Sequence, residues 1–321
     1  MSKYVKIASV QFSTRAVAKT REAGKIILGE LQDVYKRLAG YGVDLAVFSE
    51  GVESCGQTND NAENPDKPGP FLKSYQAFAR SERCHVAGSL RTIRNGRIHN
   101  SMAFISAKGE IIGIYDKVNL TTWELDAGFT PGAGAVVVDS AIGRLGGVIC
   151  FDLNFDNVLT QYKQLKPDIL AFASMYHGGL RQACWAYQCR AFFVSALPFM
   201  GCGILDPFGR ELATTHCYKT IALATVNLDR AMVHLDLNWD KFADIEHKYG
   251  NQVAVEIPAN IAPALIYSLT AKRTALDIVR EFGLELLDDY LERSTRRNDQ
   301  ARGGPALAAP PQRARHLRKQ R

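Results

Sequence analysis

The chain has 321 residues, of which 46% are hydrophobic and 22% are charged, a balance that allows a large core and excludes a disordered or fibrous protein. No apolar stretch reaches the roughly 18–20 residues that a membrane span requires, so we expect no membrane-embedded part. The formal charge of +6 is concentrated at one end. Residues 293–321 hold nine Lys or Arg and one Asp, a net charge of +8, which leaves −2 for the preceding 292 residues.

The N-terminal segment and the cysteines both bear on location. The first residues, MSKYVKIASVQF, alternate like a β-strand and lack the continuous apolar run and small-residue cleavage site of a signal peptide. The seven cysteines are an odd number, form no C-x-x-C pair and in several cases lie inside apolar segments. This distribution indicates reduced thiols and no disulfide framework or zinc site. We therefore expect a cytoplasmic protein without a bound metal.

Short segments rich in Val, Ile, Ala and Phe predict buried strands. In chain order they are 5–12, 44–48, 85–90, 101–106, 110–115, 135–139, 144–151, 168–173, 192–196 and 221–228. Helical spacing of apolar residues predicts helices over 16–39, 71–83 and 180–190, and one more that begins near Asn157. Strands that alternate with helices indicate an α/β fold. Turns at Asn95-Gly96 and Lys108-Gly109 add antiparallel hairpins, so we expect mixed sheets covered by helices.

The C-terminal part has a different pattern. Residues 229–258 are polar and irregular, 261–293 return to helical spacing, and the remainder is rich in Pro, Gly and Arg. We predict a main domain over residues 1–258, a helical extension over 259–293 and a disordered basic tail over 294–321. Clustered Arg is also typical of phosphate binding, which makes a nucleic acid or a membrane surface an alternative partner. The tail lacks interleaved aromatic residues for base stacking, so a solvated tail is the favoured interpretation.

Three predicted strands end in a reactive side chain: DLAVFSE at Glu50, EIIGIYDK at Lys117 and RLGGVIC at Cys150. Sites in open α/β sheets collect at strand ends. A thiol has a pKa of about 8.5 and is mostly protonated at neutral pH. A neighbouring carboxylate can take its proton as the sulfur attacks a carbonyl or nitrile carbon. Lys117 and the backbone N–H of Phe151 would then stabilise the oxyanion.

Each of these residues also has an ordinary structural interpretation. A Cys at the end of an apolar strand is usually a small buried hydrophobic residue, Glu50 can cap a turn, and Lys117 can be a solvated strand end. The functional interpretation therefore depends on the surrounding sequence.

The surrounding segments resemble the nitrilase superfamily, also called carbon–nitrogen hydrolases, from about Lys6 to Leu228. VKIASVQF resembles the opening strand, DLAVFSE the glutamate motif, YDKVNL the lysine motif and GGVICFDLNF the cysteine motif. Glu124 with the following GFTPG resembles the second-glutamate segment, and RAFFVSA and GILDPFGREL resemble the closing strands. Each piece alone is weak, whereas the ordered set is specific.

The resemblance implies a four-layer αββα sandwich, a Glu–Lys–Cys triad, no metal or organic cofactor, and a homo-oligomer. By motif, Glu50 would be the base, Lys117 the oxyanion partner and Cys150 the nucleophile. Glu124 would orient Lys117 or help to position the substrate. The chain departs from the family pattern at Ser49, where Pro is common, at Asn119, where His is common, and at Asp156-Asn157, where Pro-Glu is common. These departures keep the triad and indicate a divergent subgroup.

The residues after the cysteine bear on the reaction. Cys-Phe-Asp-Leu-Asn-Phe is more similar to the Cys-Tyr-Asp-Leu-Arg-Phe of amidase-like members than to the Cys-Trp-Glu of nitrilases. A small amide is therefore the favoured substrate, followed by an N-carbamoyl compound and then a nitrile. Tyr176 and His177, which follow a strand where the family places pocket residues, and Trp123, next to Glu124, are candidate pocket residues or ordinary loop and core residues. A catalytically inactive scaffold is the non-enzymatic alternative, against which the intact triad argues.

Overall fold

The computed structural model describes residues 3–14, 23–53, 59 and 61–305. The chain divides into two compact units, Met1–Leu228 and Asp229–Arg321. None of the helices within the described ranges is long and apolar enough to cross a membrane. All six cysteines in those ranges are free thiols, and Cys55 lies outside the described residues.

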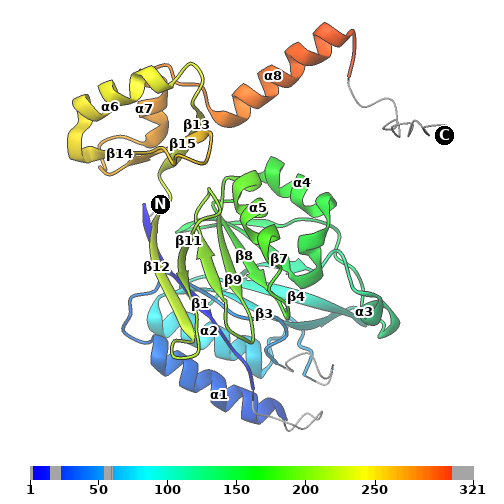
Figure 1. Ribbon diagram of the computed structural model, residues 1–321. Helices are drawn as coiled ribbons and strands as arrows, with labels where there is room; N and C mark the ends of the chain where they lie inside the picture. Colours follow the sequence, from blue (N-terminus) through cyan, green and yellow to red (C-terminus); the bar gives the residue numbers. More distant parts are fainter. Residues whose placement is uncertain (1–2, 15–22, 54–58, 60, 306–321) are drawn as a thin grey trace, which may run out of the picture. The chain divides into compact units, whose positions relative to one another are not determined.

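The first unit contains two six-stranded sheets (Figure 1). The order in the first sheet is β12-β1-β2-β3-β4-β5. Its strands are β1 (Tyr4–Val10), β2 (Leu45–Val47), β3 (His85–Arg94), β4 (Arg97–Ile105), β5 (Ile111–Asp116) and β12 (Ile221–Asn227). β1, β2 and β3 are parallel, and the other pairs are antiparallel. Asn95 and Gly96 both have positive φ and form the predicted tight turn between β3 and β4.

The second sheet has the order β11-β10-β9-β8-β7-β6 and likewise contains three parallel strands, β7, β8 and β9. Its strands are β6 (Val137–Ser140), β7 (Gly143–Ile149), β8 (Ile169–Ala173), β9 (Phe192–Ala196), β10 (Gly203–Leu205) and β11 (Glu211–Thr214). The predicted strands of this unit are therefore all present. The short β10 lies in the segment GILDPFGREL, and β11 begins in it.

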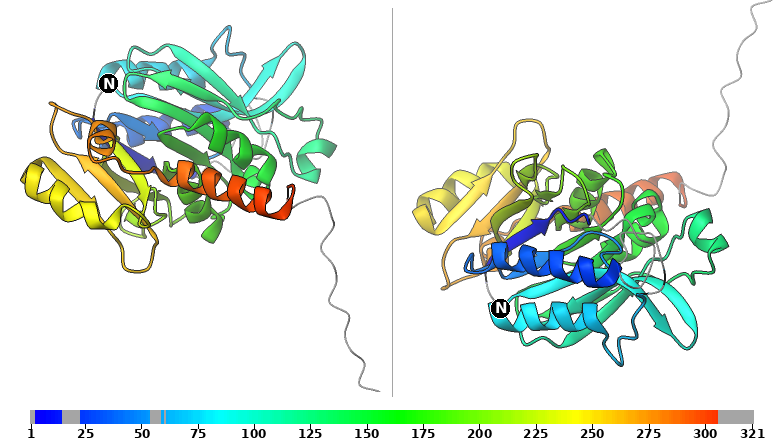
Figure 2. Two further views of the ribbon diagram at one scale, coloured as in Figure 1. Left: turned by 90° about the horizontal axis from the view of Figure 1, so that it is seen from above. Right: turned by 90° about the horizontal axis from the view of Figure 1, so that it is seen from below.

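Helices cover the outer face of each sheet (Figure 1, Figure 2). α1 (Ala23–Leu38) and α2 (Pro70–Glu82) form one core cluster with the first sheet, and α4 (Asp156–Leu165) and α5 (Leu180–Cys189) form another with the second. A third cluster joins the inner faces of the two sheets. Along β7, for example, Leu145 and Ile149 belong to the inner cluster and Val148 to the outer one, as the two-residue period of a strand requires. The predicted αββα sandwich is confirmed.

The second unit is more regular than its sequence indicated. It contains β13 (Arg230–His234), α6 (Phe242–Tyr249), β14 (Val253–Glu256), β15 (Pro263–Ser268), α7 (Ala275–Glu281) and α8 (Leu287–Arg302). The strands form an antiparallel sheet in the order β13-β15-β14, with a core of its own.

Three expectations for this part were wrong. The units divide after Leu228 and not after residue 258, and 229–258 are not irregular but contain two strands and a helix. The predicted helical stretch 261–293 begins with strand β15. Every β15 residue is buried, so the segment lacks polar alternation, and its spacing of Leu265 and Leu269 fits a helix equally well.

The predicted disordered tail also begins too early at residue 294, because α8 continues to Arg302 and ends at Gly303 in a left-handed cap. Ion pairs along the helix stabilise it: Arg296 lies 2.8 Å from Glu292, and Arg302 lies 2.6 Å from Asp299. The first, Arg-rich part of the predicted tail thus belongs to a solvated helix. Residues 306–321 lie outside the described residues.

Tyr162 of α4 fixes the strand that leads to Cys150. Its buried hydroxyl accepts hydrogen bonds from the backbone N–H groups of Gly147 at 3.1 Å and Val136 at 3.3 Å, and donates to the carbonyl of Gly147. Gly147 is a buried residue of β7, so this hydroxyl pairs with the backbone inside the strand.

Tyr162→Phe should lower the free energy of unfolding by about 1–3 kcal/mol, because buried backbone groups lose their partner while the ring remains. Urea denaturation would measure the change. Tyr218→Phe is the matched control, since Tyr218 is 93% exposed. Equal stability of the two variants would contradict the proposed role of the Tyr162 hydroxyl.

Candidate active site

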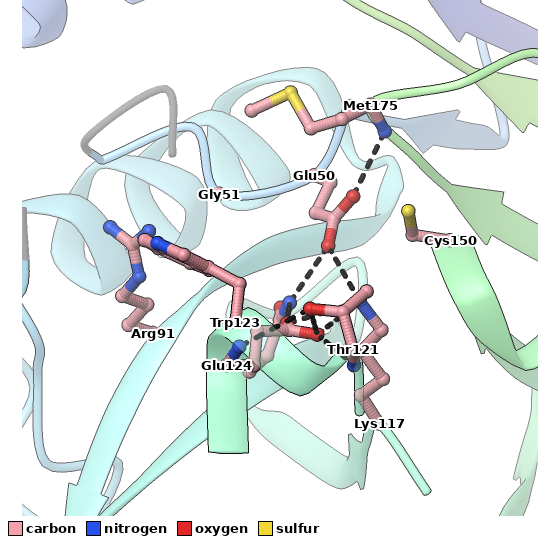
Figure 3. A pocket seen from close by; sticks show the side chains of 10 residues that line it. Glu50, Gly51, Arg91, Lys117, Thr121, Trp123, Glu124, Cys150 and Met175 are labelled. Carbon is pink, nitrogen blue, oxygen red and sulfur yellow. Dashed lines mark hydrogen bonds and ion pairs between the residues drawn. The ribbon is translucent and has the colours of Figure 1, made fainter. Parts of the chain in front are cut away.

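The three reactive side chains predicted from strand ends converge in the first unit (Figure 3). Glu50 follows β2, Lys117 follows β5, and Cys150 follows β7, so the site draws on both sheets of the sandwich. Cys150 begins a 3₁₀ turn, Cys150–Asn154, with φ of +47°. Non-glycine residues rarely adopt this left-handed conformation, and such strain is common at functional positions.

Glu50 is a buried carboxylate whose two oxygens face different partners. Its Oε1 accepts from Asn100 Nδ2 at 2.8 Å and from Lys117 Nζ at 3.3 Å. Its Oε2 accepts from the backbone N–H of Met175 at 2.9 Å. Met175 follows β8, so this bond joins the carboxylate of the first sheet to a strand end of the second.

Glu124 holds the other side of the Lys117 ammonium. Lys117 Nζ lies 3.0 and 2.8 Å from its two carboxylate oxygens. Glu124 is also the third residue of α3 (Thr122–Asp126), where it exchanges capping-box hydrogen bonds with Thr121. The local helix start therefore fixes the carboxylate that orients Lys117.

The electrostatic environment keeps both members of this pair ionised. Burial by itself lowers the pKa of Lys117, but the nearby Glu50, Cys150 and Glu124 raise it well above its usual range. Burial by itself raises the pKa of Glu124, but Lys117 and the hydrogen bond from Asn100 bring it below its usual range. Lys117 is thus a permanent cation next to Cys150.

Asn100 is a site residue that no sequence motif identified. Its side-chain amide donates to Glu50 Oε1 and to Glu124 Oε1, both at 2.8 Å, and it is itself buried. One amide group therefore sets the relative positions of both glutamates. Its only sequence signal is a polar residue directly before the predicted strand 101–106.

Asp152 connects the lysine segment to the cysteine turn. Its Oδ1 accepts from the backbone N–H groups of Asn119 at 2.6 Å and Val118 at 3.2 Å, and its Oδ2 accepts from the Tyr115 hydroxyl at 2.6 Å. Burial raises the pKa of Asp152 to about 6, although these hydrogen bonds oppose the rise. The cysteine motif contains this residue, but its role was not predicted.

The Cys150 thiol is protonated in the resting site. Burial and the negative charge of Glu50 raise its pKa to about 12, while Lys117 opposes the rise. A thiol of this kind needs a base at the moment of attack, unlike cysteines that are stored as thiolates.

A cavity of ≈ 190 Å³ opens onto these groups. Its lining residues are Glu50, Gly51, Arg91, Asn100, Lys117, Thr121, Trp123, Glu124, Cys150 and Met175 (Figure 3). Trp123, one of the candidate pocket residues, lines it and is 58% exposed. Arg91 was not predicted, because no motif marks it. No group of three or more His, Cys, Asp or Glu side chains within the described ranges is placed to hold a metal ion.

The other three predicted pocket residues are outside this lining. The ring of Phe151 packs on Phe155, with centroids 5.1 Å apart. The Tyr176 hydroxyl accepts from Asn154 Nδ2 at 3.0 Å, and His177 Nδ1 accepts from the backbone N–H of Gly179 at 3.1 Å. Contact of these three residues with a substrate remains a prediction, as does donation from the Phe151 N–H.

Comparison with known proteins finds relatives that include amidases. The chain is 25% identical to the deaminated glutathione amidase of Dictyostelium discoideum over 44% of this chain and 53% of that protein. It is 22% identical to the chloroplastic omega-amidase of Arabidopsis thaliana over 50% of this chain and 51% of that protein. The matches thus span about half the length of these relatives.

The fold has a counterpart among solved structures. Saccharomyces cerevisiae Nit3, a member of branch 10 of the nitrilase superfamily, superposes with a TM-score of 0.61 over 70% of this chain and 91% of that chain, at 18% identity. At this identity the likeness shows the fold alone. The family model described as carbon-nitrogen hydrolase matches residues 6–233. This chain therefore belongs to the carbon–nitrogen hydrolase family.

Proposed function

We propose that this protein hydrolyses the carbon–nitrogen bond of a small amide, with Cys150 as nucleophile, Glu50 as base and Lys117 as oxyanion partner. The observation that carries the proposal is the buried network of Glu50, Lys117, Glu124 and Asn100 beside Cys150 on one small cavity. Membership of the family and the amidases among the relatives support it.

In the first half of the reaction the amide carbonyl carbon is attacked by the Cys150 sulfur while Glu50 takes the thiol proton. The carbonyl oxygen becomes an oxyanion, which the Lys117 ammonium stabilises together with the predicted Phe151 N–H. When the tetrahedral species collapses, the carbon–nitrogen bond breaks and the leaving nitrogen receives the proton from Glu50. Ammonia or an amine departs, and a thioester remains on Cys150.

In the second half, water attacks the thioester while Glu50 takes one of its protons. Collapse of the second tetrahedral species releases the carboxylic acid and returns the proton to Cys150. The same groups would act on an N-carbamoyl compound, and on a nitrile with addition of water. The segment Cys-Phe-Asp-Leu-Asn-Phe favours the amide.

We also propose a reducing compartment such as the cytoplasm, which suits a nucleophilic thiol. Assembly into a homo-oligomer remains a prediction.

The first prediction concerns the reaction class. Ammonia should be released from primary amides, and intact mass after brief incubation should show an acyl adduct on the wild-type chain. Cys150→Ala should lose both. Turnover of only N-carbamoyl amino acids or nitriles would reassign the reaction, and neither turnover nor adduct from any class would favour an inactive scaffold.

The second prediction concerns the resting thiol. Because the pKa of Cys150 is raised to about 12, the thiolate fraction rises about tenfold per pH unit below that value. Its alkylation by iodoacetamide should therefore be slow at pH 7 and should increase up to pH 10 without a plateau. Peptide mass spectrometry would follow Cys150 separately from the other cysteines. A plateau near pH 7 would show a stored thiolate and contradict the need for Glu50 as base.

The third prediction separates the two glutamates. Glu50→Gln and Glu124→Gln are nearly isosteric, and each removes one negative charge from beside Lys117. Loss of the base should lower kcat by about 10²–10⁴, and the loss should be smaller for Glu124→Gln, since that carboxylate orients Lys117 and transfers no proton. Steady-state ammonia release would measure both. The reverse order would assign the base to Glu124.

A further inference from the structure

Arg91 is a cationic side chain of the cavity that the proposed reaction does not use. It lies on β3, is 5% exposed and lines the same cavity as Cys150 and Lys117 (Figure 3). The β3–β4 register pairs it with Asn100, which bridges the two glutamates. The sheet thus fixes Arg91 relative to the catalytic network.

Buried contacts hold the guanidinium group in place. Its Nη1 lies 3.5 Å from Oε1 of the fully buried Glu53. The group also lies over the ring of Phe129, 5.6 Å from its centroid, and the ring of Trp123 is 6.4 Å from that of Phe129. A buried ion pair gives little stability compared with a well-packed apolar pair. Its position on the cavity wall therefore indicates a role in recognition.

Charge on the cavity wall limits what this role can be. Lys117 and Arg91 are the two cationic side chains among the described lining residues. Lys117 is already bound by Glu50 and Glu124, and a substrate anion there would compete with the proposed base. Arg91 is paired with a carboxylate that does not line the cavity. A planar guanidinium is also well suited to a carboxylate.

Building on the proposed function, we propose that Arg91 binds a carboxylate on the substrate. When ammonia is the leaving group, that carboxylate must be on the acyl part. A cavity of ≈ 190 Å³ is small beside the roughly 300–1,000 Å³ of typical ligand pockets, which suits a short acyl chain. The substrate class is therefore a monoamide of a short dicarboxylic acid, with the amide carbon at Cys150 and the acid at Arg91.

The test compares matched amides that differ in terminal charge. Succinamic and glutaramic acids carry the carboxylate, butanamide and pentanamide are neutral counterparts, and 4-aminobutanamide carries a cation. For the wild-type enzyme, kcat/KM should be about 10–100-fold higher for the anion than for the neutral amide, mostly through KM, as a charge-assisted hydrogen bond implies. The cationic amide should be the poorest substrate.

Variants assign this preference to Arg91. In Arg91→Gln the anion-to-neutral ratio should fall to near one, and in Arg91→Lys it should be intermediate. Arg97→Gln is the control, because it removes the same charge from an exposed position on the neighbouring strand β4 and should keep the wild-type ratio. Urea midpoints would check folding, and if Arg91→Gln does not fold, the ratio in Arg91→Lys decides.

Two results would overturn the assignment. One is a wild-type enzyme that turns over neutral or cationic amides at least as well as the anion. The other is an unchanged ratio in the Arg91 variants, which would leave Arg91 a structural role only. Both are distinct from failure of the proposed function, in which none of the amides is hydrolysed and Cys150 forms no adduct.

Discussion

The structure of the site depends on one buried cation, the ammonium of Lys117, between the carboxylates of Glu50 and Glu124. A charge removed from water must be paired and hydrogen-bonded, or it costs several kcal/mol. Here two carboxylates meet that requirement, and Asn100 holds both of them. The pairing can form only if β2, β4 and α3 bring their residues to the end of β5. The electrostatic demand of one lysine therefore constrains four elements of the sandwich.

The proposed nucleophile, Cys150, comes from the other sheet, and two contacts join that sheet to this network. Asp152 binds the backbone after Lys117, and the Met175 N–H binds Glu50. Both contacts involve backbone groups, so the distance between the sheets is set by main chain as well as by side-chain packing. Tyr162 supports β7 from the opposite face. The geometry of the candidate site is in this sense a property of the whole four-layer sandwich.

The first unit was predictable where its chemistry lies at strand ends. Glu50, Lys117 and Cys150 each follow an apolar run. β2 and β5 run in the same direction, because β2 is parallel to β3 and two antiparallel pairings separate β3 from β5, so Glu50 and Lys117 lie at one edge of their sheet. Arg91 and Asn100 lie within a hairpin instead, and their position depends on strand register, which local sequence does not specify. The second unit was mispredicted for a related reason. Its strands are either buried on both faces or too short to show the alternation of polar and apolar residues that marks a strand. The sequence pattern therefore predicts an irregular segment and a helix where the structure has a three-stranded sheet.

The charges also explain why Lys117 needs two carboxylates and not one. With Glu50 and Glu124 ionised and Cys150 neutral, these groups carry a net charge of −1. In the proposed mechanism, transfer of the thiol proton would neutralise Glu50, and attack on the carbonyl would move the negative charge to the oxyanion. The total charge stays at −1, because one negative charge moves from Glu50 on one side of Lys117 to the oxyanion on the other. The buried site therefore gains no net charge during the step. Glu124 keeps the ammonium in place as Glu50 is protonated. If Glu50 were the only carboxylate, its protonation would leave the Lys117 ammonium without an ion-pair partner in the step in which that ammonium must stabilise the oxyanion.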